Sequence, residues 1–308
     1  MVCRDEVQAA AERIVGYVRE TPIIRLRGEE IGVPGDLVLK LEQLQHTGSF
    51  KVRGAFNALL SQPIPAAGVI AASGGNHGAG VAFAARRLGV PAEIFVPEAT
   101  PEVKLARLRG YGATVRQVGA NFAEAQAACR ARAAETGALR VHAYDQPEVL
   151  AGQGTLAREL EAQAPELDTV LVAVGGGGLI GGIASWYAGR TRVVGVEPEA
   201  AATLWSALQA GEPVDVEVGG IAADALGARR AGQLGFAVAQ RHIDDVVLVP
   251  DEAILQAQQA LWDQLRLIAE PGGATALAAL LAGAYTPHPG ERVGVIICGG
   301  NTEPGKIA

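Results

Sequence analysis

Cysteine is scarce in this chain of 308 residues. It occurs three times, as Cys3, Cys129 and Cys298, and no two of these residues form a CxxC pair. An odd number of widely separated cysteines argues against both a disulfide framework and a structural zinc site. We therefore expect three reduced thiols and no resident metal.

The sequence also lacks long basic runs, and its formal net charge is −7. A nucleic-acid or anionic-membrane surface would need clustered lysine and arginine, so we expect neither partner. No window reaches the roughly 18 uninterrupted apolar residues of a membrane span. The opening residues, Met1 to Glu6, carry charges where a secretory signal has an apolar core, so we expect a cytoplasmic protein.

Apolar residues make up 49% of the chain and charged residues 19%, a composition that can bury a large core in one or two domains. Short apolar runs alternate with alanine-rich stretches. The runs predict buried strands at 36–41, 68–72, 92–97, 169–174, 192–196 and 293–297. The stretches between them predict helices at 78–88, 101–111, 122–136, 154–164 and 252–267. This alternation is typical of an α/β fold whose mainly parallel sheet carries helices on both faces.

A lysine lies between turn-forming residues and a helix-like run in the segment from Thr47 to Ala55, which reads TGSFKVRGA. A lysine held in a pocket can act as a nucleophile toward a carbonyl group, the role that a pyridoxal phosphate (PLP) enzyme requires of it. Most lysines are instead solvated surface residues. Lys51 becomes a candidate because other segments of the chain offer further parts of a cofactor site.

The first of these segments is a glycine-rich loop. Gly175, Gly176, Gly177 and Gly178 directly follow a predicted strand, and Leu179 begins a helix-like run. Successive backbone N–H groups at such a helix start can converge on a phosphate. A flexible turn is the plain alternative. The dinucleotide loop of an NAD-dependent oxidoreductase is another, because the glycine spacing alone does not separate the two cofactors.

The second segment, Ser73 to Gly78, also follows a predicted strand and begins a helix. The Ser73 hydroxyl and the backbone amides of this turn can receive a carboxylate, and Asn76 can hydrogen-bond a ring oxygen. Helix capping by Ser73 or Asn76 explains the same residues. His77 has no acidic partner of a catalytic triad nearby, and packing explains it equally well.

Residues in the second half of the chain have similarly open interpretations. Cys298 ends a predicted strand, where it is either a small buried hydrophobe or a partner for a cofactor ring. Glu270 precedes Pro271, and a helix stop alone explains this pair. The run Glu197-Pro198-Glu199 hints at a cation site, although a surface turn is the simpler interpretation.

Together these segments closely resemble the fold-type II PLP enzymes, in particular the branch of the serine/threonine dehydratases and serine racemase. Val52 favours the dehydratase side, because threonine and cysteine synthases usually carry an aspartate directly after the lysine. The matching segments keep the same order along nearly the whole chain: Thr21-Pro22, 40–57, 73–78, 151–155, 175–178, Glu197-Pro198, Glu270-Pro271 and 298–301.

The resemblance implies PLP as the cofactor and gives roles to the matching residues. Lys51 would bond to the cofactor and act as acid and base, and Phe50 would pack beside the ring. Asn76 would contact the ring hydroxyl, and Cys298 would pair with the pyridine nitrogen. The phosphate would be bound by Gly175, Gly176, Gly177, Gly178 and Leu179, and the substrate carboxylate by Ser73, Gly74, Gly75, Asn76 and His77.

The resemblance further implies a homodimer of two-domain subunits with the cofactor between the domains. The small domain would comprise residues 45–148, and the large domain residues 1–44 and 149–308. The expected reaction is β-elimination from a small hydroxy amino acid, L-threonine or L-serine, to 2-oxobutyrate or pyruvate plus ammonia. The alternatives are an amino-acid racemase, a lyase for a hydroxyaspartate or an ectoine-pathway amino acid, and a PLP protein without activity.

Departures from the family pattern narrow this expectation. Racemases of the branch carry a serine where this chain has Gly74, which has no proton to give, so we expect weak or absent racemisation. The cation site of some relatives pairs a glutamate with an acidic residue six positions later. Here Glu197 is followed at that position by Thr203, so we expect no activation by metal. Because the chain ends at Ala308, we also expect no regulatory domain and no inhibition by isoleucine.

Overall fold

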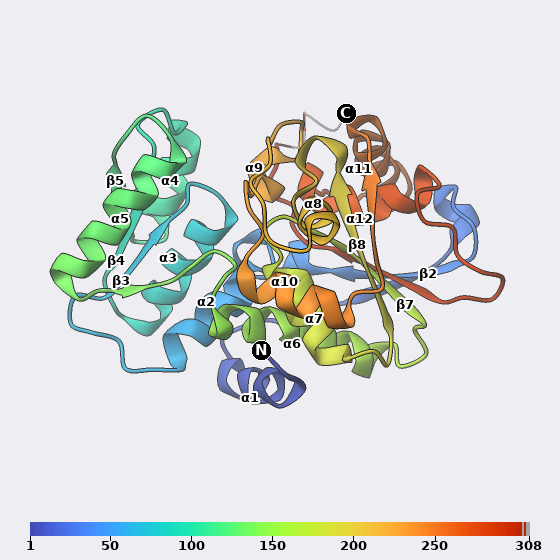
Figure 1. Ribbon diagram of the computed structural model, residues 1–308, viewed down its shortest axis with the longest axis horizontal. Helices are drawn as coiled ribbons and strands as arrows, with labels where there is room; N and C mark the ends of the chain where they lie inside the picture. The colour runs from blue at the N-terminus through green and yellow to red at the C-terminus, as the bar shows by residue number, and fades with distance from the viewer. Residues whose placement is uncertain (304, 306–308) are drawn as a thin grey trace.

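Two open sheets with packed helices organise this α/β chain (Figure 1). The computed structural model describes residues 1–303 and 305. The two sheets lie apart in Figure 1, with α2 (Lys51–Leu60) between them. The mainly parallel α/β fold predicted from the alternation of strands and helices is confirmed.

The larger sheet has six strands in the order β1-β2-β10-β7-β8-β9. β1 pairs antiparallel with β2, and every other neighbouring pair is parallel. β7 and β10 are buried at every position, as expected of central strands that helices cover on both faces. The strands are β1 (Ile23–Arg27), β2 (Asp36–Leu41), β7 (Thr169–Ala173), β8 (Arg192–Pro198), β9 (Asp245–Val249) and β10 (Val293–Ile297).

The smaller sheet has four strands, all parallel, in the order β5-β4-β3-β6. Its strands are β3 (Val69–Ala72), β4 (Ala92–Val96), β5 (Thr114–Gln117) and β6 (Leu139–Arg140). We propose that each sheet is the centre of one domain, with the boundaries that the sequence predicts: 45–148 for the small domain and 1–44 with 149–308 for the large one.

Helices cover both faces of the larger sheet. α12 packs on β10, β7 and β8, while α7 packs on β7 and β8 from the other side (Figure 1). No helix among residues 1–303 and 305 is long and apolar enough to cross a membrane. Besides α2, the α-helices are α1 (Arg4–Ile14), α3 (Asn76–Leu88), α4 (Glu102–Gly110), α5 (Phe122–Thr136), α6 (Pro147–Gln163), α7 (Gly178–Tyr187), α8 (Thr203–Ala210), α9 (Ala223–Leu226), α10 (Gln233–His242), α11 (Asp251–Leu265) and α12 (Pro271–Leu281); short 3-10 helices span Gly28–Ile31, Glu42–Leu44, His46–Gly48 and Glu199–Ala201.

The six strands predicted from apolar runs are all present, and they correspond to β2, β3, β4, β7, β8 and β10. The four strands that the sequence did not predict, β1, β5, β6 and β9, are the edges of the two sheets. Edge strands are exposed along one side and carry polar residues there, so they lack the continuous apolar run of a buried strand.

The largest difference between a predicted and an observed helix start is at α6. α6 starts at Pro147 instead of residue 154, and it contains Gly152 and Gly154 in its interior. Glycines usually weaken a helix, but here they let other backbone segments approach closely. A Cβ on Gly154 would lie 2.6 Å from the carbonyl oxygen of Gly182 in α7, and one on Gly152 would lie 2.7 Å from the carbonyl oxygen of Arg53 in α2.

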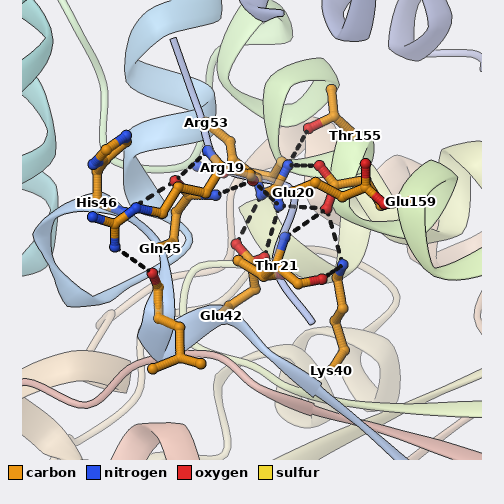
Figure 2. Close-up of polar contacts among 12 residues, drawn as sticks. Arg19, Glu20, Thr21, Lys40, Glu42, Gln45, His46, Arg53, Thr155 and Glu159 are labelled. Atoms are coloured by element: carbon orange, nitrogen blue, oxygen red, sulfur yellow. Dashed lines mark hydrogen bonds and ion pairs between the residues drawn. The ribbon is translucent and has the colours of Figure 1, made fainter. Parts of the chain in front are cut away.

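A buried cluster of four charged side chains joins α2, α6 and β2 (Figure 2). The Arg53 guanidinium donates to both oxygens of Glu42, at 2.8 and 2.7 Å, and to both oxygens of Glu159, at 2.6 and 2.9 Å. Lys40 donates to the same Glu159 carboxylate at 2.9 Å. Two positive and two negative groups therefore balance one another.

The surroundings of this cluster complete its hydrogen bonds. The side chains of Arg53, Lys40 and Glu42 are fully buried. The Thr21 hydroxyl donates to Glu42, and the Thr21 carbonyl accepts from Lys40 (Figure 2). Burial lowers the pKa of Lys40 and alone would raise that of Glu159, but Arg53 and Lys40 hold the Glu159 pKa below its ordinary value.

Replacement of Arg53 by methionine should destabilise the fold strongly. The change leaves two carboxylates without their main partner in a buried setting, which typically costs about 3–5 kcal/mol of unfolding free energy. Urea denaturation followed by far-UV circular dichroism measures the loss. R109M is the control, because Arg109 forms an exposed pair with Glu102 and its loss should leave the denaturation midpoint in place. Equal midpoints for R53M and the wild type would contradict this account.

Candidate active site

A cavity lies at the carboxyl ends of β7 and β10, the edge at which open α/β sheets usually bind ligands. It brings together segments that are far apart in the sequence and come from both sheets. The residues that line it are Phe50, Lys51, Asn76, Tyr144, residues 173–180, Ala225, Leu226, Glu270 and Cys298. Every predicted cofactor-binding residue is among them.

The backbone that carries Lys51 is tied to the end of β10. The Phe50 N–H donates to the carbonyl oxygen of Cys298 at 3.2 Å, and the Gly300 N–H donates to that of Gly48 at 2.9 Å. Gly48 has a φ of 70°, a left-handed conformation that favours glycine. These bonds fix the start of α2, with Lys51 as its first residue.

The Lys51 amine is held in the cavity by one hydrogen bond, to the carbonyl oxygen of Ala143 at 3.0 Å. Burial lowers the pKa of this amine from about 10.5 to about 8, although Cys298 and Glu270 act in the opposite direction. The positive end of the α2 dipole also disfavours a cation at the first helical residue. About a tenth of the amine is therefore neutral, and nucleophilic, at pH 7.

The glycine loop takes the shape that the sequence predicts, a turn between β7 and the start of α7. Gly177 has a φ of 90°, which a residue with a side chain rarely adopts. Within residues 1–303 and 305, the N–H groups of residues 175–179 have no hydrogen-bond acceptor. Five consecutive donors at a helix N-terminus are a ready site for an anion such as a phosphate.

Tyr144 is a wall of the cavity that the sequence analysis missed. Its ring lies so closely against the glycine loop that a Cβ on Gly176 would overlap the ring atoms. The Tyr144 hydroxyl donates to the carbonyl oxygen of Arg230 at 3.3 Å, which anchors the ring. The glycines at residues 176 and 178 were the available signal in the sequence, because both lie against Tyr144. A glycine alone, however, does not identify the residue that packs against it.

Cys298 directly follows β10 and lies in the cavity, with 3% of its surface exposed. Its thiol donates to the carbonyl oxygen of Gly272 at 3.4 Å. Burial raises the pKa of this thiol, and the nearby Glu270 carboxylate raises it further. Cys298 is therefore a neutral thiol, and its predicted contact with a ring nitrogen stays a prediction.

The predicted carboxylate-binding turn lies next to the cavity, and only Asn76 contributes to the lining. The Ser73 hydroxyl accepts from the Gly75 N–H at 3.2 Å. The His77 ring is 3.1 Å from the carbonyl oxygen of Val141, and burial lowers its pKa to about 3, so the imidazole is neutral. The role of Ser73, Gly74, Gly75 and His77 in substrate binding stays a prediction.

Glu197 is enclosed by the protein at the end of β8. Its carboxylate accepts from the N–H groups of Leu204 and Trp205, each at 2.8 Å, and so caps α8. Burial raises the pKa of Glu197 to about 8. The described residues contain no cluster of three or more acidic, histidine or cysteine side chains that could hold a metal ion.

A family model for pyridoxal-phosphate dependent enzymes matches residues 14–299, which is nearly the whole chain. This chain belongs to that family. Its cofactor is therefore PLP, and the glycine loop is not the dinucleotide loop of an NAD enzyme.

Individual members of the PLP family agree with this assignment. An L-threonine ammonia-lyase from Geobacter sulfurreducens is 42% identical over 98% of this chain and 76% of its own length. The chain spans 56% of the Escherichia coli biosynthetic L-threonine dehydratase, at 40% identity. Among solved structures, the T.th. threonine deaminase has a TM-score of 0.91 at 38% identity, covering 98% of this chain and 99% of its own. Maize serine racemase has a TM-score of 0.92 at 32% identity, covering 99% of this chain and 95% of its own.

The cavity suits PLP on its own geometry. An amine that is partly neutral near pH 7 fits the aldehyde, and five free N–H groups fit the phosphate. The Phe50 ring and the Cys298 thiol offer an apolar wall and a weak polar partner for the pyridine ring. The donor set therefore matches the cofactor that the family requires.

A methyl group at residue 176 should weaken PLP binding by about tenfold or more, since it displaces Tyr144 or the loop that carries the phosphate donors. Absorbance titration of cofactor-stripped G176A with PLP measures the dissociation constant. The matched control is G110A in α4, where a Cβ would meet no atom within 4 Å. A wild-type dissociation constant in G176A would show that the packing of Tyr144 on this loop does not matter.

Proposed function

We propose that this protein is a PLP-dependent ammonia-lyase for L-threonine or L-serine. The β-hydroxyl leaves as water, and a water molecule then hydrolyses the resulting enamine to 2-oxobutyrate or pyruvate and ammonia. The observation that carries the proposal is the placement of the Lys51 amine in one cavity with the glycine loop. The similarity to an L-threonine ammonia-lyase over 98% of the chain supports this choice of substrate.

Each site residue has a role in this proposal. The N–H groups of residues 175–179 bind the phosphate, and Phe50 packs beside the ring. The turn Ser73 to His77 receives the substrate carboxylate through its backbone amides, and Asn76 contacts the ring oxygen. When bound, PLP withdraws electrons from the substrate Cα. With PLP bound, the Lys51 amine would take the Cα proton, because burial makes the neutral form of this amine accessible.

A neutral thiol as the partner of the ring nitrogen favours elimination. With PLP bound, the neutral Cys298 thiol would not keep a proton on that nitrogen as an aspartate would, so electron withdrawal by the ring would be weaker. Elimination tolerates this, because the electrons released at Cα form a double bond to Cβ as the hydroxyl leaves. Reactions in which negative charge stays on Cα depend more on electron withdrawal by the pyridine ring.

We further propose that the enzyme is a homodimer of the cytoplasm. The three widely separated cysteines support a reducing compartment, because their number and spacing do not suit a disulfide framework. The dimer is supported by the resemblance to the dehydratase branch, and light scattering on the purified protein measures it.

Purified protein should release keto acid and ammonia from L-threonine or L-serine. Lys51→Ala should abolish this, because the proposed reaction gives the Cα proton to the Lys51 amine. Borohydride reduction followed by peptide mass mapping should find the pyridoxyl group on residue 51. A label on another residue, or full turnover by Lys51→Ala, would contradict the assignment. The same assay with hydroxyaspartate and diamino acids tests the alternative lyases.

The protein should form little or no D-serine from L-serine. Gly74 occupies the position where racemases of this branch carry a serine, so no hydroxyl there can return a proton to the opposite face of Cα. Chiral chromatography of the reaction mixture measures this. G74S tests the cause, since its Cβ would lie 3.3 Å from Thr100 and so fits with a small adjustment. Rapid racemisation by the wild type would refute the argument.

A further inference from the structure

Glu270 lies in the cofactor cavity without a role in the proposed reaction. It precedes α12, with 6% of its surface exposed, and its carboxylate shares the cavity with Lys51 and Cys298. A helix stop needs only the backbone of this residue. The buried carboxylate therefore needs another explanation, since burial of an acid is costly unless it is bonded.

A chain of side-chain hydrogen bonds begins at Glu270. Glu270 Oε1 accepts from Asn76 Nδ2 at 2.6 Å, and Asn76 Oδ1 accepts from Asn301 Nδ2 at 2.6 Å. Asn301 Nδ2 also donates to the carbonyl oxygen of Thr47 at 2.9 Å. Both ends of the Asn76 amide are therefore fixed by residues from other parts of the chain.

This arrangement determines what Asn76 can offer to a ligand. An amide nitrogen has two N–H groups, and Glu270 accepts one of those on Asn76. The second has no acceptor within residues 1–303 and 305, and Asn76 lines the cofactor cavity. Because the amide plane is held at both ends, the direction of this free N–H is fixed before a ligand arrives.

Glu270 itself has little freedom to move. A Cβ on Gly299 would overlap Glu270 Oε1, so the carboxylate packs directly on the Gly299 backbone. The Glu270 N–H also donates to the carbonyl oxygen of Gly299 at 3.1 Å. The acceptor that orients Asn76 is therefore rigid.

We propose that Glu270 is a positioning residue for the cofactor: by accepting from Asn76, it aims the free N–H of Asn76 at the oxygen of the PLP ring. The proposal rests on the contact of Asn76 with the ring that the proposed function includes. It requires a hydrogen-bond acceptor at residue 270, and it does not require a negative charge there.

The charges around Glu270 agree with a role that tolerates either protonation state. Burial raises the pKa of Glu270 to about 7, and the hydrogen bond from Asn76 opposes this rise. A carboxylate and a carboxylic acid both accept from an amide. The charged and titratable groups that act on Glu270 are Asp224, Arg107, Lys104, Lys51 and Cys298.

The test is PLP binding by the cofactor-stripped full chain, measured by absorbance without substrate. E270Q keeps an acceptor of the same shape, so its dissociation constant should stay within about threefold of the wild type. E270M has a similar volume but no acceptor, and its dissociation constant should rise by about tenfold, the worth of one hydrogen bond. E291Q is the matched control, since Glu291 is a hydrogen-bonded carboxylate outside the cavity and its loss should leave the dissociation constant unchanged.

A double-mutant cycle separates positioning through Asn76 from a general structural effect. In an N76A background, E270M should change the dissociation constant by less than about threefold, because the group that Glu270 orients is gone. E270A gives a second variant without an acceptor if E270M does not fold by circular dichroism. An unchanged constant in E270M, an equal loss in E270Q, or a full tenfold loss in the N76A background would each overturn the proposal. These measurements need no substrate, so the binding results remain interpretable even if the lyase assay fails.

Discussion

The fold and the site both depend on the buried charge cluster of Arg53, Lys40, Glu42 and Glu159. Arg53 lies two residues after Lys51 in the same helix. Its partners are Glu42, in the 3-10 helix after β2, and Glu159 on α6, and Lys40 of β2 also pairs with Glu159. Ion pairs this deeply buried gain little stability over apolar packing, because both charges lose their water. Their strength is directional, since a guanidinium that bonds two carboxylates fits in one position only. The cluster thus fixes the rotation of α2 about its axis.

The rotation of α2 about its axis determines where the Lys51 amine lies. α2 is held at its start by the bond from Phe50 to Cys298 and along its length by Arg53, so Lys51 enters the cavity between two fixed points. The glycine loop reaches the same cavity from β7 and α7. Rigid elements therefore carry both the Lys51 amine and the N–H groups that bind the phosphate. Catalysis benefits from groups that need no reorganisation.

The sequence predicted the parts of this protein that local physics determines. Buried strands such as β7 and β10 are continuous apolar runs, and Gly175 to Gly178 sit where a strand must turn into a helix. The four edge strands were missed because one exposed side removes that run. Tyr144 and the contact between Glu270 and Asn76 were missed for another reason. Their roles arise from contacts between segments that are distant in the chain, and no spacing in the sequence reports such a contact.

The position of β10 has a consequence for how the protein is made. β10 pairs with β2 on one side and with β7 on the other, and its end bonds to the start of α2. A ribosome that synthesises this chain releases Lys51 well before residues 293–298. The emerging polypeptide therefore carries its reactive lysine for a time without a completed sheet around it. The vitamin-derived cofactor gains its binding site only after β10 has paired with β2 and β7.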